Sequence, residues 1–204
     1  MIEDGIFDMS KKISLKQFLM KTGKFEKAYR AVSEVRNGKV TISNEVIDNP
    51  NFFFNPRTSA VKYNGEKLTE VKNLYFAFNK PLEYVCQKSR NEKTVYEFID
   101  KLNLDDASKK SLFAVGRLDK DTEGLLVITN DGKLSSILTQ PNNGIEKEYH
   151  VSAENPINKA QIKSIEKGIT IHLEEGDYTT REAKATPVDG GKVCITITEG
   201  KKRQ

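Results

Sequence analysis

The stretch from Ala114 to Gly132 constrains this chain more than any other part of its sequence. It reads Ala-Val-Gly-Arg-Leu-Asp-Lys-Asp-Thr-Glu-Gly-Leu-Leu-Val-Ile-Thr-Asn-Asp-Gly, so a polar loop leads directly into an apolar run that ends at turn residues. A short apolar run with such boundaries indicates a buried strand. A carboxylate on the loop before a buried strand is held more rigidly than one on an open surface. The stretch therefore predicts a core strand preceded by a rigid loop that carries Asp119.

Two interpretations of this acidic loop can be weighed from its residues alone. The first is a calcium-binding EF-hand loop, because suitable residues occupy its positions 1, 3, 5 and 6, namely Asp119, Asp121, Glu123 and Gly124. However, position 12 of that loop requires a bidentate acid, and Asn130 stands there. The second interpretation is a solvated acidic turn. It does not explain why Arg and Leu precede Asp119 in this order.

The stretch resembles the signature loop of the pseudouridine synthases, in the branch that modifies ribosomal RNA and carries an N-terminal S4 domain. Three further blocks resemble blocks of this family in the family's order. Residues 74–81 resemble the strand that opens the catalytic domain, residues 146–151 a later strand, and residues 198–204 the start of the C-terminal basic motif. Each block alone is weak, but four in the same order are specific.

The resemblance implies roles for four residues. Asp119 would be the catalytic carboxylate, and Arg117 would enter the gap that the extruded base leaves. Tyr149 would stack on the flipped uracil and assist proton transfer at C5, although a tyrosine packed in the core remains an alternative. Lys80, beside Pro81, would support the catalytic loop, with a plain surface lysine as the alternative.

The implied reaction needs neither a metal nor a cofactor. Converting uridine to pseudouridine breaks the N1–C1′ bond and rejoins the base through C5, without hydrolysis or redox change. One carboxylate can serve, either by adding covalently or by removing a proton from the sugar. A glycosidase, by contrast, generally uses two carboxylates and a water. A base cannot be reached within a helix, so the target base would have to be flipped out.

The sequence departs from the family at its C-terminus. The basic motif of the family continues to an apolar residue and an Arg, whereas this sequence stops at Gln204. We therefore expect the last part of the catalytic domain to be missing, and activity to be impaired. Lys201 or Arg203 could replace the basic partner of Asp119. The alternative function is a non-catalytic, S4-type RNA-binding or ribosome-associated protein.

Composition sets the broad class. With 204 residues, 37% hydrophobic and 30% charged, the chain suits one large or two small globular domains. The longest apolar runs are too short for a membrane span, and the acidic N-terminus lacks a signal peptide. We expect a cytoplasmic monomer without membrane contact. Cys86 and Cys194 would be reduced core residues, and the spacing of His150 and His172 indicates no zinc site.

Basic residues concentrate near the N-terminus. The net charge is only +4, but residues 11–39 hold nine basic side chains against two acids. The same region shows helical apolar spacing in two segments, around Leu15 and around Ala31. Two amphipathic helices with basic outer faces suit phosphate contacts. The candidate RNA-binding residues are Lys21, Lys24, Lys27, Arg30, Lys201 and Arg203.

The N-terminal region resembles the S4 RNA-binding module. After the two helical segments, residues 37–47 predict a turn and a hairpin, because Asn37-Gly38 can adopt positive backbone angles. A last strand ends at Tyr63. The usual Ser-Arg-Arg at the start of the second helix is replaced by residues 24–27, Lys-Phe-Glu-Lys, which leaves the phosphate contacts open. A basic domain that only packs against its neighbour is the alternative.

These patterns predict an S4-like domain at residues 1–64, a linker at 65–73 and a catalytic domain at 74–204. Strands are expected near 74–79, 84–87, 112–115, 124–129, 146–152, 169–173, 181–187 and 192–198, and helices near 94–102, 133–140 and 158–167. The fold class is therefore α+β with a mainly antiparallel sheet. The expected partner is ribosomal RNA. Residues 168–171 and 180–183 look closer to the large-subunit branch of the family.

Overall fold

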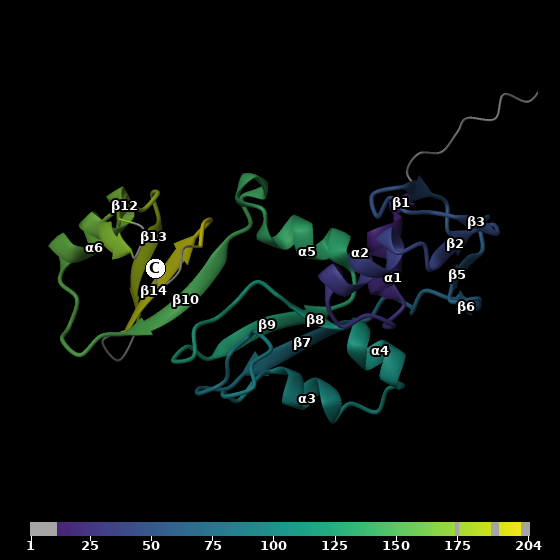
Figure 1. Cartoon of the computed structure of the whole chain (residues 1–204). Helices are drawn as coiled ribbons and strands as arrows, with labels where there is room; N and C mark the ends of the chain where they lie inside the picture. Colours follow the sequence, from purple (N-terminus) through teal and green to yellow (C-terminus); the bar gives the residue numbers. More distant parts are fainter. Residues whose placement is uncertain (1–11, 174–175, 189–191, 201–204) are drawn as a thin grey trace, which may run out of the picture. The chain divides into compact units, whose positions relative to one another are not determined.

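The computed structural model describes residues 12–173, 176–188 and 192–200. It divides into two compact units, Met1–Gly132 and Lys133–Gln204, and Figure 1 follows the chain through both. This division falls within the segment predicted as the catalytic domain. The predicted boundary at residues 65–73 stays a prediction.

The first part of unit 1 holds two helices and short antiparallel strands. In chain order these are β1 (Ile13–Ser14), α1 (Leu15–Lys21), α2 (Ala28–Arg36), β2 (Val40–Ile42), β3 (Glu45–Val46), β4 (Phe53–Phe54), β5 (Val61–Tyr63) and β6 (Glu66–Leu68). β3, β2, β5 and β6 form one sheet in that order, and β1 pairs with β4. Strand β6 lies in the segment predicted as a linker. This segment is therefore partly a strand, because β6 pairs antiparallel with β5.

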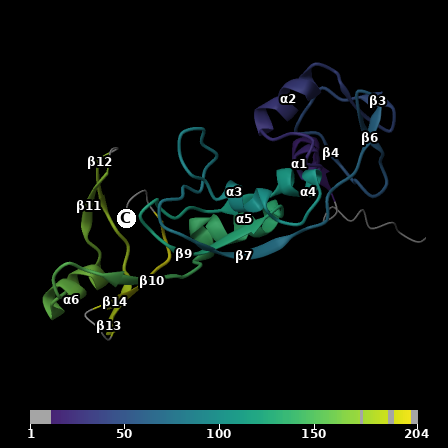
Figure 2. The ribbon, with the colours of Figure 1, turned by 90° about the horizontal axis from the view of Figure 1, so that it is seen from below.

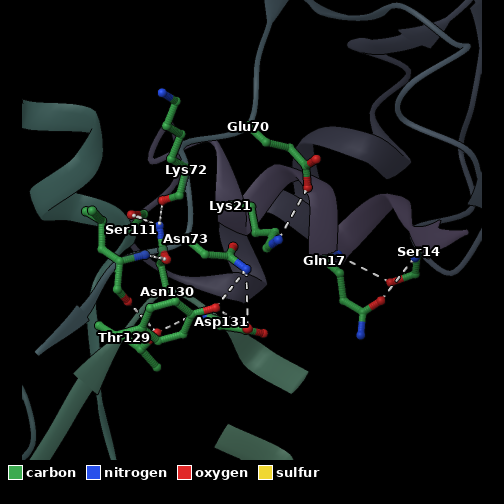
Figure 3. Close-up of polar contacts among 12 residues, drawn as sticks. Ser14, Gln17, Lys21, Glu70, Lys72, Asn73, Ser111, Thr129, Asn130 and Asp131 are labelled. Atoms are coloured by element: carbon green, nitrogen blue, oxygen red, sulfur yellow. Dashed lines mark hydrogen bonds and ion pairs between the residues drawn. The ribbon is translucent and has the colours of Figure 1, made fainter. Parts of the chain in front are cut away.

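Helix α1 begins at a capping box. The Gln17 backbone N–H donates to Ser14 Oγ at 3.3 Å, and the Ser14 N–H donates to Gln17 Oε1 at 3.1 Å (Figure 3). Two of the free N–H groups at the helix start are thereby satisfied. The predicted apolar faces of both helices are confirmed, because Leu15, Ala31 and Val35 are fully buried in one core.

The Asn-Gly pair is not the hairpin turn. Asn37 caps α2, and Gly38 takes a left-handed φ of 69° just after the helix, as glycine commonly does at helix ends. The turn between β2 and β3 is made instead by Ser43 and Asn44, with φ of 51° and 71°. Positive φ at both central residues is typical of a tight hairpin turn.

The second part of unit 1 is a sheet with helices on it. Its elements are β7 (Tyr75–Lys80), α3 (Tyr96–Asp100), α4 (Asp106–Ser111), β8 (Phe113–Val115) and β9 (Gly124–Thr129). The strand order is β7-β9-β8 and both pairings are antiparallel. Ile99 of α3 packs on Ile128 of β9 in a buried cluster, and Figure 1 shows α3 on that side of the sheet.

The end of β9 is tied to the start of β7 by side chains. Thr129 Oγ1 donates to the Leu74 carbonyl at 2.6 Å, and the Leu74 N–H donates to Asn130 Oδ1 at 2.8 Å. The buried Asn130 also donates to the Lys72 carbonyl and to Ser111 Oγ, at 2.9 and 3.1 Å (Figure 3). The Asn-Asp-Gly end of the signature stretch is therefore a structural anchor for the central strand.

Unit 2 is a second antiparallel arrangement. The elements are α5 (Gly132–Thr139), a 3-10 helix at Pro141–Asn143, β10 (Lys147–Ser152), α6 (Lys159–Lys167), β11 (Thr170–Leu173), β12 (Gly176–Thr179), β13 (Lys184–Val188) and β14 (Lys192–Ile197). Strands β10, β14 and β13 form one sheet, and β11 pairs with β12. Ile162 of α6 packs on Ala185 and Val193 of the sheet, where Figure 2 shows α6 beside the strands.

The predicted α+β class with antiparallel sheets is confirmed, with local differences. Residues 84–87 are not a strand and contribute only the bridge from Val85 to Thr94. The helix predicted at 94–102 is shorter, and α4 was not predicted, although Asp105 caps its first turn by accepting from the Ser108 N–H. In the part of the chain that the structure describes, no helix is long and apolar enough to cross a membrane.

Candidate active site

Asp119 lies on the loop between β8 and the central strand β9. Gly116 begins this loop with a positive φ of 74°, a conformation that favours glycine. Arg117 and Asp119 are both exposed. The Thr122 N–H donates to the Asp119 carbonyl at 3.1 Å, which turns the chain back toward β9. The predicted loop before a core strand is therefore present.

A buried thiol holds the residue before Asp119. Cys86 is 6% exposed. Its Sγ lies 3.3 Å from both polar backbone atoms of Leu118, accepting from the N–H and donating to the carbonyl. Leu118 in turn packs against the small apolar cluster around Cys86 and Val95. One side chain thus fixes both backbone groups of the residue next to Asp119.

A buried ammonium holds the residue after Asp119. Lys80 is 0% exposed, so the alternative of a plain surface lysine is wrong. Its Nζ donates to the Pro81 carbonyl at 2.8 Å and to the Lys120 carbonyl at 3.4 Å. The Lys120 carbonyl also accepts from the Glu83 N–H at 2.9 Å. A buried charge is stable only with such partners. Because one of them is the Lys120 carbonyl, the Lys80 ammonium contacts the loop next to Asp119.

The two contacts bracket Asp119. Leu118 is anchored to the segment that follows β7 and Lys120 to the last residue of β7, while the side chain of Asp119 itself is exposed. Within the described residues, no donor forms a hydrogen bond or ion pair with the Asp119 carboxylate. A carboxylate that is fixed through its backbone and free at its oxygens is suited to meet a substrate, because its position is set before binding.

The sequence reasoning identified Lys80 but missed Cys86. It assigned Cys86 only to an apolar stretch, since nothing in the local sequence shows that its thiol meets Leu118, 32 residues further along the chain. Cys86 and Cys194 are both free thiols; Cys86 is buried as predicted, whereas Cys194 is only half-buried.

Tyr149 lies in unit 2. It is half-buried on β10, where it pairs with Ile195 of β14. Its neighbours Glu148 and His150 are exposed, as expected from the alternation of side chains along a strand. The role predicted for Tyr149 stays a prediction.

The basic residues predicted to contact RNA differ in their surroundings. Lys21 and Lys24 pair with Glu70 and Glu66, at 3.7 and 3.3 Å, and Figure 3 includes the first pair. Within the described residues, Lys27 forms no ion pair; its ammonium lies over the ring of Tyr29.

Arg30 is exposed on α2 and makes no ion pair to any residue that the structure describes. The predictions for Lys201 and Arg203 lie outside the described residues.

A carboxylate held at a fixed position can act by proton transfer or by nucleophilic attack. A family model described as RNA pseudouridylate synthase matches residues 73–204. The chain belongs to this family of isomerases, and the pseudouridine synthase family predicted from the four sequence blocks is thereby confirmed. The S4-domain branch stays a prediction.

Individual relatives are also pseudouridine synthases by name. The chain is 35% identical over 173 residues to the ribosomal small subunit pseudouridine synthase A of Salmonella typhimurium, covering 84% of this chain and 71% of that protein. It is 34% identical over 174 residues to an uncharacterized RNA pseudouridine synthase of Bacillus subtilis, covering 83% and 70%. A crystal structure of a pseudouridylate synthase is similar with a TM-score of 0.58 at 26% identity, covering 93% of this chain and 79% of that one.

Proposed function

We propose that this chain converts a uridine of ribosomal RNA to pseudouridine, with Asp119 as the catalytic carboxylate. The observation that carries the assignment is the bracketed loop, in which Cys86 and Lys80 anchor the two neighbours of an exposed Asp119. The family supplies the reaction class. The same two findings favour an enzyme over the alternative of a non-catalytic RNA-binding protein.

The chemistry asks little of the protein beyond placement. The N1–C1′ bond of the uridine breaks, the base turns, and C5 bonds to C1′. The proton on C5 is then lost and N1 gains one, so the product is an isomer. Asp119 acts either as a nucleophile or as the base that removes a sugar proton. Both roles need a carboxylate at a fixed position, which the anchored loop provides.

Other residues complete the proposal. Arg117, two residues before Asp119, enters the gap left by the flipped base, and Tyr149 stacks on the uracil. Lys80 and Cys86 are positioning residues, because they touch the loop backbone and not its exposed side. The N-terminal helices and sheet form an S4-like RNA-binding domain. In support, Lys27, the N-cap residue of α2, and Arg30 of the same helix form no ion pairs to any described residue.

The comparisons change the ribosomal subunit in which we expect the target uridine. The sequence pointed to the large ribosomal subunit, but several relatives are ribosomal small subunit pseudouridine synthases. Nothing among the comparisons supports the large-subunit preference. The relatives favour a uridine of the small-subunit RNA as the target of this chain.

Mapping pseudouridines in ribosomal RNA from cells that lack this protein tests the proposal. One ribosomal pseudouridine should disappear, return with the wild-type gene and stay absent with the Asp119→Asn gene. Loss confined to transfer RNA, or restoration by the Asn variant, would contradict it.

A further inference from the structure

Three different metal-binding side chains converge on one sheet of unit 2. Glu148 and His150 lie on β10, and Cys194 lies on β14. Their ligand atoms, a carboxylate oxygen, a ring nitrogen and a thiol sulfur, all lie within 4.8 Å of one another. His150 Nε2 is already 3.0 Å from Glu148 Oε1.

The register of the sheet produces this convergence. Residues two apart on a strand share a face, so Glu148 and His150 project to the same side of β10. Cys194 is the residue paired with His150 across the β10–β14 ladder, and facing residues of neighbouring strands lie close together. The argument from spacing along the chain, which indicated no zinc site, could not detect a ligand set that forms across strands.

The cluster is accessible to a metal ion. The apolar side of this sheet carries Val193 and Ala185, which pack against α6. Cys194 has the opposite parity on β14, so it projects to the other face. There Glu148 and His150 are exposed and Cys194 is half-buried.

We propose that Glu148, His150 and Cys194 form a zinc-binding site whose fourth position is open to water. Zn²⁺ prefers this combination of sulfur, nitrogen and oxygen in a tetrahedron, at about 2.0–2.3 Å from each atom. Ligands at such distances lie roughly 3.3–3.7 Å apart. The three side chains therefore need only small rotations to close on the ion. Harder ions such as Mg²⁺ and Ca²⁺ disfavour the thiol.

A metal ion at this site has to displace the proton of the Cys194 thiol. Burial and the nearby Glu148 carboxylate raise the pKa of the Cys194 thiol. A bound cation stabilises the thiolate, and the thiol proton leaves to solvent on binding. On the neighbouring strand β13, the Lys184 Nζ pairs with Glu146 at 2.7 Å.

The site is separate from the isomerisation, which needs no metal. Its effect would be local, because the ion would tie β10 to β14. Tyr149 lies between the two β10 ligands and projects to the opposite face. A metal here would stiffen the strand that carries Tyr149 without touching that side chain.

The chain offers a matched control. On the hairpin of β11 and β12, His172 pairs with Asp177 across the ladder, and their side chains are hydrogen-bonded. This pair reproduces the histidine and carboxylate of the proposed site without a thiol. If exposed histidine–carboxylate pairs alone captured the ion, His172 would contribute as much as His150.

Titration of the purified full chain with Co²⁺, a spectroscopic substitute for Zn²⁺, tests the site. One equivalent should give a thiolate-to-cobalt charge-transfer band, and Zn²⁺ should displace it. Cys194→Ala should abolish the band, and His150→Ala should weaken Co²⁺ binding by more than about tenfold, since even outer-shell partners are worth that much. His172→Ala should bind like the wild type.

Circular dichroism on each variant establishes that it folds. If Cys194→Ala does not fold, Cys194→Ser replaces it in the titration. Absence of the band at equimolar Co²⁺ in the wild-type chain would overturn the proposal. So would a band that persists without the Cys194 thiol, or one that falls equally with His172→Ala.

Discussion

At the scale of single residues, Asp119 is distinguished by how it is held. Acidic side chains are common on loops, and Asp121 and Glu123 lie exposed on the same one. Among these three acids, only Asp119 stands between two residues whose backbone groups are held by buried side chains, namely Leu118 and Lys120. The polar atoms that anchor them belong to a thiol and an ammonium, both buried.

Replacing Asp119 by Asn should abolish conversion. The change keeps the shape of the side chain and removes the negative charge that either proposed role requires. Turnover on ribosomal RNA, measured by release of the C5 proton, should fall to background while RNA affinity is kept. Asp121→Asn removes the same charge from the same loop and should retain activity. Comparable losses in the two variants would show that only the loop charge matters.

Replacing Cys86 by Ala should slow the chemical step more than it weakens RNA binding. The variant leaves the Leu118 N–H and carbonyl without their partner, and a displaced reacting group can cost up to about 100-fold in rate. We expect a single-turnover rate lower by roughly 10-fold or more, and faster hydrogen exchange at the Leu118 amide. Cys86→Ser should recover much of the rate, because a hydroxyl can also donate and accept. A wild-type rate alongside faster exchange would refute the positioning role.

At the scale of elements, local patterns predicted what local chemistry determines. The apolar run of residues 124–129 is β9 to the residue, and the periodicity of residues 15–19 is the buried face of α1. Strand β12 was missed because Gly176–Thr179 is short and mostly exposed, and its pairing with β11 creates it. Neither the contact of Cys86 nor that of Cys194 could be predicted, since both arise from packing between distant segments.

The basic helices should separate into strong and weak contributors to RNA binding. Lys21 and Lys24 are partly neutralised by Glu70 and Glu66. The double variant Lys27→Gln/Arg30→Gln should therefore reduce the slope of log affinity against log salt by about 2, close to one per lost phosphate contact. Lys21→Gln/Lys24→Gln should reduce it less.

Binding measured across a salt series makes the comparison. Equal slopes for both double variants and the wild type would show that α1 and α2 do not face the phosphates.

At the scale of the whole molecule, family and reaction class followed from sequence blocks, while the subunit preference did not. The blocks around Asp119 and Lys80 are tied to shared chemistry and resemble the family as a whole. Residues 168–171 and 180–183 were used to choose the large subunit. The first of these segments runs into β11 and the second directly follows β12, where resemblance carries little information about which RNA is bound.

The purified chain should discriminate between ribosomal RNAs. Incubated with protein-free small-subunit and large-subunit RNA in equal amounts, it should form pseudouridine at one position of the small-subunit RNA. RNA of this kind is recognised by shape and by unpaired bases, so short unstructured fragments should react poorly. Sequencing after pseudouridine-specific labelling identifies the position. Modification of the large-subunit RNA alone would restore the original prediction.

The two anchors of the Asp119 loop have a consequence for how the chain folds. The hairpin of β8 and β9 is local, but the anchors reach back 32 and 40 residues, to Cys86 and Lys80. Contacts between distant segments form late, because closing long loops costs entropy. A nascent chain can thus possess the carboxylate and its hairpin while lacking a working catalyst. The chain becomes catalytically competent only when the segment with Lys80 and Cys86 packs against the Asp119 loop.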